Sequence, residues 1–174
     1  MPSASAFGAL VSFLGEMAVT FCVTFTFVNS VGSVSIVRGR SMLPTLEGGE
    51  APFGADLVLV SSLAKRKCHP GDIVVCRSPI SPSVYLVKRL IAEPEDVVQN
   101  IANGELVAIP PGHCWIEGDN VFESGDSTQF GPVPQGLLVG KVYAVLWPPS
   151  RLQWLTHQPV ADVPHSFRVP KRNH

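Results

Sequence analysis

Two short segments of the sequence carry side chains that could do chemistry together. The first, RGRSMLPTL at residues 38–46, places Ser41 three residues before Pro44. Proline fixes its own φ and favours an extended conformation at the residue before it, so Ser41 is expected on a stiff, non-helical backbone. A hydroxyl presented in this way could act as a nucleophile. Taken alone, the segment is more typical of an ordinary turn.

The second segment, LVKRLIA at residues 86–92, predicts a β-strand that contains two adjacent basic residues. Because side chains alternate between the faces of a strand, Lys88 shares a face with the apolar Leu86 and Leu90. Arg89 then lies on the opposite face. One of the two basic residues must therefore share a face with apolar neighbours. If that one is Lys88, burial lowers the pKa of its amine, which suits a general base near neutral pH. The alternative is that Lys88 extends from the edge of the sheet into solvent.

The N-terminal residues differ in composition from the rest of the chain. Glu16 is the only charged side chain among residues 1–37, and the 21 positions from 17 to 37 are uncharged. At about 1.5 Å per residue, such a run approaches the roughly 30 Å of a bilayer core, which predicts a membrane anchor over residues 1–33. A cleaved secretory signal is disfavoured because no basic residue precedes Arg38. A buried core helix is the remaining alternative.

Beyond this run, short β-type segments alternate with Gly, Pro, Asn and Asp. The expected strands cover residues 56–60, 72–76, 84–91, 96–101, 105–109, 114–118 and 139–147. Asn103-Gly104 between two of them predicts a hairpin. The expected fold class is mostly β, an antiparallel barrel or sandwich over residues 34–156. Residues 157–174 contain three prolines and no apolar periodicity, which predicts a disordered tail.

Composition and charge exclude several classes of function. The 174 residues include 13 basic and 14 acidic side chains, which provide no positive field for a nucleic-acid backbone, so no nucleic-acid partner is expected. The four cysteines form no CxxC pair and have no histidine at metal-ligand spacing, so no metal or other cofactor is expected. A Cys68–Cys76 disulfide across a turn would need an oxidising compartment and stays open.

Four short motifs together resemble the type I signal peptidase family. In the order of the family they are SMLPT at 41–45, GDIVVCRSP at 71–79, KRLIAEPED at 88–96 and GDNVFESGDSTQFGPV at 118–133. The resemblance implies a signal-peptidase-like antiparallel β domain behind one transmembrane helix, acting as a serine endopeptidase. It implies that Ser41 is the nucleophile and Lys88 the general base. The endoplasmic reticulum branch of the family carries histidine in place of this lysine.

The same resemblance implies supporting roles for polar residues near this pair. Ser124 would orient the lysine amine, and the loop beside it would be held by Asp119, Asn120 and Asp126. The arginines that the family carries at two positions of this loop are Val121 and Thr128 here, so no salt bridge to Asp126 is expected from them.

The residues next to Ser41 are expected to serve the oxyanion and the substrate. The backbone N–H of Ser41 would donate to the oxyanion. In the best-known bacterial members a hydroxyl two residues before the nucleophile is the second donor, and here that position is Gly39, so the second donor stays open. Met42 and Pro44 are expected to contact the substrate.

Within the family, the chain looks most like the compact mitochondrial inner membrane branch, which lacks the large accessory domain of the bacterial enzymes. EGGEAPFGA at 47–55 and LWPPSR at 146–151 favour its subunit 2 type over subunit 1. This likeness implies a heterodimer with a sister catalytic subunit, precursors with cleavable sorting peptides as substrates, and a catalytic domain that faces the intermembrane space. The basic pair Arg38 and Arg40 would instead favour the cytosolic or matrix side of the membrane.

Two rival functions use the same sequence features. One is a non-catalytic, membrane-tethered β scaffold that stabilises an active partner peptidase. The presence of both Ser41 and Lys88 favours the enzyme, because a scaffold has no need for a buried amine beside a serine. The other is a self-cleaving Ser/Lys protease of the repressor type. Those proteins are soluble, so the apolar N-terminal run argues against this second rival.

Overall fold

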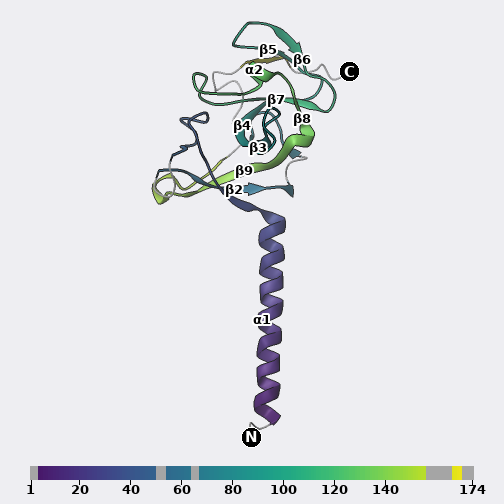
Figure 1. Cartoon of the computed structure of the whole chain (residues 1–174), viewed down its shortest axis with the longest axis vertical. Coiled ribbons are helices and arrows are strands. Elements are labelled where there is room, and N and C mark those ends of the chain that lie inside the picture. The colour runs from purple at the N-terminus through teal and green to yellow at the C-terminus, as the bar shows by residue number, and fades with distance from the viewer. Residues whose placement is uncertain (1–3, 50–53, 64–66, 156–165, 170–174) are drawn as a thin grey trace.

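A computed structural model describes residues 4–49, 54–63, 67–155 and 166–169, with a long helix that leads into a β domain (Figure 1). Its helical elements are α1 (Ala4–Val31), the one-turn α2 (Ser127–Phe130), and the 3-10 turns η2 (Gln135–Leu137) and η3 (Pro149–Arg151). Its strands are β1 (Ser33–Ile36), β2 (Leu57–Ser61), β3 (Ile73–Arg77), β4 (Tyr85–Ala92), β5 (Val97–Gln99), β6 (Leu106–Ala108), β7 (His113–Glu117), β8 (Val133–Pro134), β9 (Leu138–Trp147), β10 (Gln153–Trp154) and β11 (Phe167–Val169).

Helix α1 spans 28 residues and projects away from the β domain (Figure 1). It exposes large apolar side chains, among them Phe13, Met17, Phe21 and Phe25. Among the residues that the structure describes, no helix was found that is both long enough and apolar enough to cross a membrane. The helix expected over residues 1–33 is therefore present, but its membrane-spanning character is not confirmed.

A single residue, Gly32, joins the end of α1 to the start of β1. A Cβ atom at this position would lie 2.9 Å from the carbonyl oxygen of Val60 and 3.2 Å from Leu59 Cδ1, both in β2. Those separations are shorter than ordinary van der Waals contacts, so only glycine lets the chain pass this close to β2. The helix is thus attached directly to the edge of the sheet.

The main sheet has eight strands in the order β1-β2-β9-β3-β4-β7-β8, with β10 also paired to β9. A second sheet has the order β11-β5-β6. All of these pairs are antiparallel, and register shifts within β2–β9, β3–β9 and β4–β7 bend the main sheet. Among the described strands, β1 and β8 remain as open edges, so the sheet does not close into a barrel.

The seven predicted strands are all present, within one or two residues of the expected bounds. The predicted Asn103-Gly104 hairpin joins β5 to β6, with Gly104 at a positive φ of 74°. The prediction of a disordered tail is wrong at residues 166–169, where β11 pairs with β5. The rest of that tail, residues 157–165 and 170–174, lies outside the described residues. Strand β1 was not predicted.

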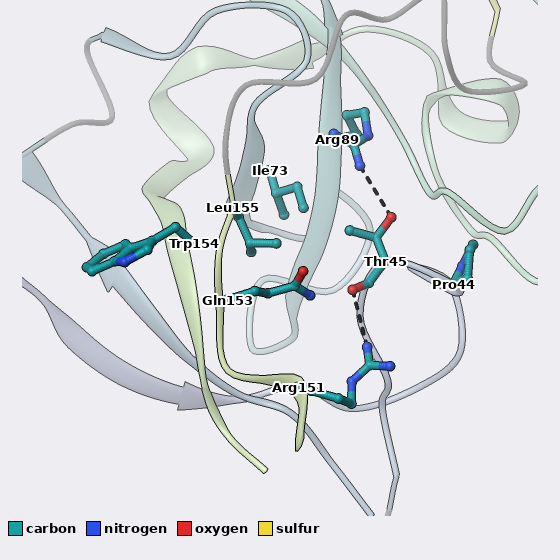
Figure 2. A pocket seen from close by; sticks show the side chains of 8 residues that line it. All are labelled: Pro44, Thr45, Ile73, Arg89, Arg151, Gln153, Trp154 and Leu155. Carbon is teal, nitrogen blue, oxygen red and sulfur yellow. Dashed lines mark hydrogen bonds between the residues drawn. The ribbon is translucent and has the colours of Figure 1, made fainter. Parts of the chain in front are cut away.

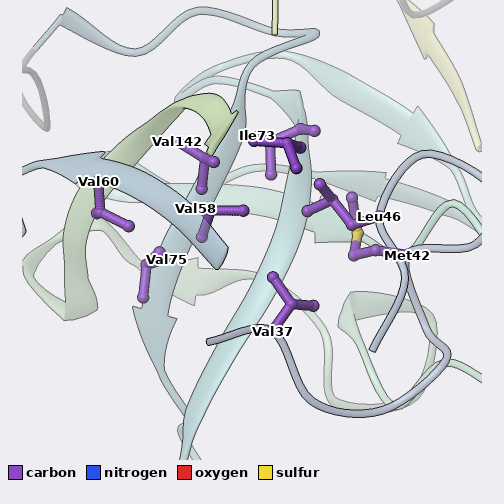
Figure 3. Packing of buried hydrophobic residues seen from close by; sticks show 9 residues of the cluster. Val37, Met42, Leu46, Val58, Val60, Ile73, Val75 and Val142 are labelled. Atoms are coloured by element: carbon purple, nitrogen blue, oxygen red, sulfur yellow. The ribbon is translucent and has the colours of Figure 1, made fainter. Parts of the chain in front are cut away.

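The segment around Ser41 is fixed by apolar side chains that enter the core (Figure 3). Met42 and Leu46 are 1% and 0% exposed and pack in one cluster with residues of β2, β3 and β9, among them Val58 and Ile73. The Leu46 amide donates to the Met42 carbonyl at 2.9 Å, so a turn places both side chains on one face. The backbone expected to be stiff and non-helical at Ser41 is a turn, which the burial of these two side chains favours.

A buried ion pair joins β4 to the loop that follows β7. Arg89 donates from Nε and Nη2 to the two carboxylate oxygens of Asp119, at 2.8 and 2.6 Å, and both side chains are 1% exposed. Arg89 Nη1 also donates to the Gly71 carbonyl at 2.8 Å. A guanidinium stays charged at any working pH, so it can be buried here only with such partners.

Asp119→Ala should therefore destabilise the protein by about 3–5 kcal/mol, because it leaves the buried Arg89 without its carboxylate. The exposed pair between Arg40 and Glu123, at 3.5 Å, provides the control. Glu123→Ala should cost at most about 1 kcal/mol. Urea denaturation of the full chain in detergent measures both losses. Similar losses for the two variants would show that the buried pair does not organise the domain.

Candidate active site

Lys88 lies in β4 with its side chain inside the domain and 2% exposed. It is paired across the sheet with Val74, and the same face carries the apolar cluster that includes Cys76 and Leu90. Burial lowers the pKa of Lys88, and the negative charge of Asp126 partly opposes this shift. The amine is therefore buried, as a general base at this position requires. At a given pH, a larger fraction of it is neutral than in a surface lysine.

A hydroxyl group links the Lys88 amine to a carboxylate through two hydrogen bonds. Lys88 Nζ donates to Ser124 Oγ at 2.8 Å, and Ser124 Oγ donates to Asp126 Oδ2. Asp126 Oδ2 also accepts from the Gly118 amide at 2.8 Å. Its Oδ1 accepts from the Thr128 amide at 3.0 Å and the Thr128 hydroxyl at 2.7 Å, at the start of α2. Thr128 thus provides two contacts where the family resemblance would place an arginine.

Ser41 is half-buried and is held through its backbone. Its carbonyl accepts from the Asn120 amide at 3.0 Å, and the Asn120 side chain donates to the Arg40 carbonyl at 3.1 Å. A Cβ at Gly118 would collide with both Ser124 Oγ and the Ser41 carbonyl oxygen. The absence of a side chain at Gly118 therefore lets the three segments that carry Ser41, Gly118 and Ser124 meet.

Ser41 and Lys88 line the same groove, whose volume is about 640 Å³. One wall consists of residues 35–39, in and after β1, and the other of residues 84–88 at the start of β4. This part of β4 pairs with β3, whereas its pairing with β7 begins only at Arg89. Among the described strands, the first half of β4 therefore has a free hydrogen-bonding edge.

The other predicted site residues are distributed over two places. Gly39 lines the groove at a positive φ of 83° and has no hydroxyl to offer. Met42 also lines the groove, but its side chain is buried in the core. Pro44 lies outside the groove and lines a second cavity of about 290 Å³ together with Thr45 and Arg151 (Figure 2). The structure therefore does not bring Pro44 to Ser41 and Lys88.

Sequence reasoning named Asp119 as a loop residue but missed its partner Arg89. The signal was present, because strand alternation places Arg89 between the apolar Val87 and Ile91 on the face opposite Lys88. A charged side chain on an apolar face requires a buried counter-ion. It also missed Arg151, for which no local pattern exists, since its partners lie about a hundred residues earlier in the chain.

The cysteines near Lys88 are poor candidates for the nucleophile. Burial raises the pKa of Cys76 to about 11 and that of Cys114 to about 12, so both thiols stay protonated near neutral pH. All four cysteines are free thiols. Within the described part of the chain, no group of three His, Cys, Asp or Glu side chains could hold a metal ion.

Comparison with known proteins addresses the resemblance seen in the motifs. The family described as signal peptidase, peptidase S26, matches residues 10–108 and 99–147. The chain belongs to the signal peptidase family, peptidase S26. Among relatives of this S26 chain, mitochondrial inner membrane protease subunit 2 of Mus musculus is 41% identical over 136 residues, which cover 76% of this chain and 77% of the relative.

Two further relatives of this S26 peptidase chain come from fungi. Subunit 2 of the mitochondrial inner membrane protease of Saccharomyces cerevisiae is 35% identical over 74% of this chain and 76% of its own length. Subunit 1 of Schizosaccharomyces pombe is 38% identical over 66% of this chain and 73% of its own length. The predicted likeness to signal peptidases and to their mitochondrial inner membrane branch is therefore confirmed.

Burial of the Lys88 amine should make the S26 domain less stable than a variant without this charge. In the unfolded chain the pKa of this lysine has its ordinary value of 10.5, whereas in the folded domain it is lowered. Below the lowered pKa both states are protonated, so the full cost of burying the charge reduces the free energy of unfolding. This cost disappears as the pH rises to 10.5. Lys88→Met should therefore raise the free energy of unfolding near pH 7, and the gain should shrink towards pH 10. Urea denaturation across this range tests it, and a gain independent of pH would contradict it.

Proposed function

We propose that this chain is a catalytic subunit of a membrane-bound serine endopeptidase that removes sorting peptides from precursor proteins, with Ser41 as nucleophile and Lys88 as general base. The observation that carries the proposal is the buried Lys88 amine, held by Ser124 on the groove that Ser41 also lines. Membership of the signal peptidase family supports the same reaction.

In the first step, the neutral Lys88 amine takes the proton from Ser41 Oγ as this oxygen attacks the scissile carbonyl. The tetrahedral intermediate collapses when the ammonium returns its proton to the leaving amine nitrogen, which leaves an acyl-enzyme ester on Ser41. Lys88 then removes a proton from a water molecule that attacks the ester, and the Ser41 hydroxyl is restored. The backbone N–H of Ser41 would donate to the oxyanion in both intermediates.

Ser124 gives the amine the orientation that this reaction needs. Its single hydroxyl proton is donated to Asp126, so its oxygen can only accept from Lys88. A neutral amine has two N–H bonds and one lone pair. With one N–H committed to Ser124, the lone pair stays available for the proton of Ser41.

The groove would bind the precursor as an extended strand beside the free edge of β4. Alternate side chains of such a strand point towards the domain, so the first and third residues before the cleaved bond would dominate specificity. The apolar wall contributed by Val75, Val84 and Val87 favours small or apolar side chains at those positions. Residues 41–45 form a turn, so β4 provides the strand beside which the precursor would dock.

We propose that the chain resides in the mitochondrial inner membrane with its catalytic domain in the intermembrane space. Relatives named subunits 1 and 2 of the mitochondrial inner membrane protease support this site and a heterodimer with a sister catalytic subunit. The exposed apolar surface of α1, including Phe21 and Phe25, supports its use as a single membrane anchor in contact with lipid.

The two proposed catalytic side chains should each be indispensable. Ser41→Ala and Lys88→Met should each abolish precursor cleavage by an enzyme whose sister subunit has had its own nucleophile replaced, and the double variant should be no worse than either, because both side chains act in one step. Ser33→Ala, a change of an exposed serine in β1 that does not line the groove, is the control and should leave cleavage intact. Cleavage retained by either single variant would favour the non-catalytic scaffold function.

The pH dependence of cleavage should report the amine of Lys88. Because the neutral form is the base, kcat/KM should rise with pH through the lowered pKa of Lys88 and fall in acid. The charge of Asp126 raises this pKa, so Asp126→Asn should move the acidic limb to lower pH even if the rate falls. Glu123→Gln, an exposed change in the same loop, is the control. An acidic limb that does not move in Asp126→Asn would contradict the assignment.

A further inference from the structure

The two sequence segments that favour the subunit 2 type lie close together in the structure at Arg151. This residue ends the LWPPSR segment at residues 146–151. Its guanidinium contacts Glu47, the first residue of the EGGEAPFGA segment at 47–55, and Asp56, which directly follows that segment; residues 50–53 lie outside the described residues. Arg151 Nη1 lies 3.1 Å from Glu47 Oε1, and Nε and Nη2 each lie 3.0 Å from one oxygen of the Asp56 carboxylate.

Asp56 is a fixed acceptor for this guanidinium. Its side chain is 1% exposed, and its Oδ2 also accepts from the Glu47 amide at 2.8 Å. The Asp56 amide donates to the Glu47 carbonyl at 2.8 Å, and its carbonyl accepts from Val37 at 2.9 Å. Arg151 therefore joins residues 47 and 56, the two ends of this loop. Asp56 in turn links the loop to Val37, directly after β1.

Arg151 also reaches the turn that carries Ser41. Its Nη2 donates to the Thr45 carbonyl at 3.3 Å, and Arg89 approaches the Thr45 hydroxyl from the other side at 3.5 Å (Figure 2). The cavity of about 290 Å³ borders Thr45, so on that side the turn is held by these polar contacts and not by packing. The turn continues to Ser41 through the bond from the Leu46 amide to the Met42 carbonyl.

We propose that Arg151 is a positioning residue for the nucleophile. By holding Thr45 and the loop after it, Arg151 fixes the turn so that Ser41 Oγ stays within reach of the Lys88 amine. This role rests on the proposed function of Ser41 and Lys88. It requires arginine, because one planar guanidinium reaches Asp56 with two nitrogens and the Thr45 carbonyl at the same time, which a single ammonium cannot do.

The chain offers a matched control at Arg168. The Arg168 side chain is 27% exposed and pairs with Asp96, 1% exposed, at 2.7 Å. The Arg151 side chain is 25% exposed and pairs with Asp56, also 1% exposed, at 3.0 Å. Arg168 lies on β11 of the second sheet and has no described contact with the turn at 41–46. The two ion pairs are similarly buried, but only the Arg151 pair is connected to the turn that carries Ser41.

The experiment compares Arg151→Gln and Arg168→Gln in the full chain, assembled with its sister subunit and acting on one precursor. Arg151→Gln should lower kcat by about 10- to 100-fold with little change in KM, because a misplaced nucleophile slows the chemical step more than binding. Arg168→Gln should leave kcat unchanged while it lowers the melting temperature to a similar degree. Equal kcat values in the two variants would overturn the proposal.

A second variant and a second measurement keep the test decisive if Arg151→Gln folds poorly. Arg151→Lys keeps the charge and the aliphatic stem of the side chain. Its kcat should nevertheless fall nearly as far as that of Arg151→Gln. Hydrogen exchange at the Leu46 amide should be faster in both Arg151 variants and unchanged in Arg168→Gln. Exchange at Leu46 that does not respond to Arg151 would overturn the positioning role.

The proposed function and the role of Arg151 can fail separately. If Ser41→Ala still cleaves the precursor, the catalytic assignment fails, whatever Arg151 does. If Ser41→Ala is inactive and Arg151→Gln cleaves as fast as Arg168→Gln, the catalytic pair stands and the positioning role is wrong.

Discussion

The site depends on keeping one lysine amine buried while none of the described carboxylates contacts it directly. A direct ion pair would stabilise the ammonium and raise the pKa of Lys88, whereas an entirely apolar pocket would leave its N–H bonds without an acceptor. The Ser124 hydroxyl meets both needs, because it accepts from the amine and donates to Asp126. Asp126 is held by Gly118 and Thr128, so β4, the end of β7 and the start of α2 must come together before the amine has its partner.

Two adjacent basic residues of β4 are buried with different kinds of partner, because only one of them can lose its proton. Lys88 can lose its proton, so the domain buries it with a neutral partner. Arg89 cannot lose its proton, so it is buried beside the carboxylate of Asp119, which lies in the loop after β7. The same strand thereby places a buried amine on one face and a buried ion pair on the other. Through Thr45, that ion pair also borders the turn in which Ser41 lies.

Much of the β domain could be predicted from the sequence because alternation and turn residues are local signals. The same alternation predicted that one of the two basic residues of β4 shares a face with apolar side chains but did not decide which, and the structure buries both Lys88 and Arg89. Strand β1 was missed because its four residues continue an apolar run, and β11 because its three residues are defined by pairing with β5, far away in the chain. Pro44 was assigned to the groove because its closeness to Ser41 in sequence suggested contact. The turn that buries Met42 and Leu46 instead directs Pro44 to the other cavity.

The direct connection between α1 and β1 has a geometric consequence. Gly32 is the single residue between helix and sheet, and the Val60 carbonyl leaves no room for a side chain at this position. A change in the tilt of α1 must therefore move β1, and β1 leads into one wall of the groove. Ser35, four residues after the helix ends at Val31, already lines the groove. The orientation of the helix and the shape of this side of the groove are therefore coupled through one short stretch of backbone.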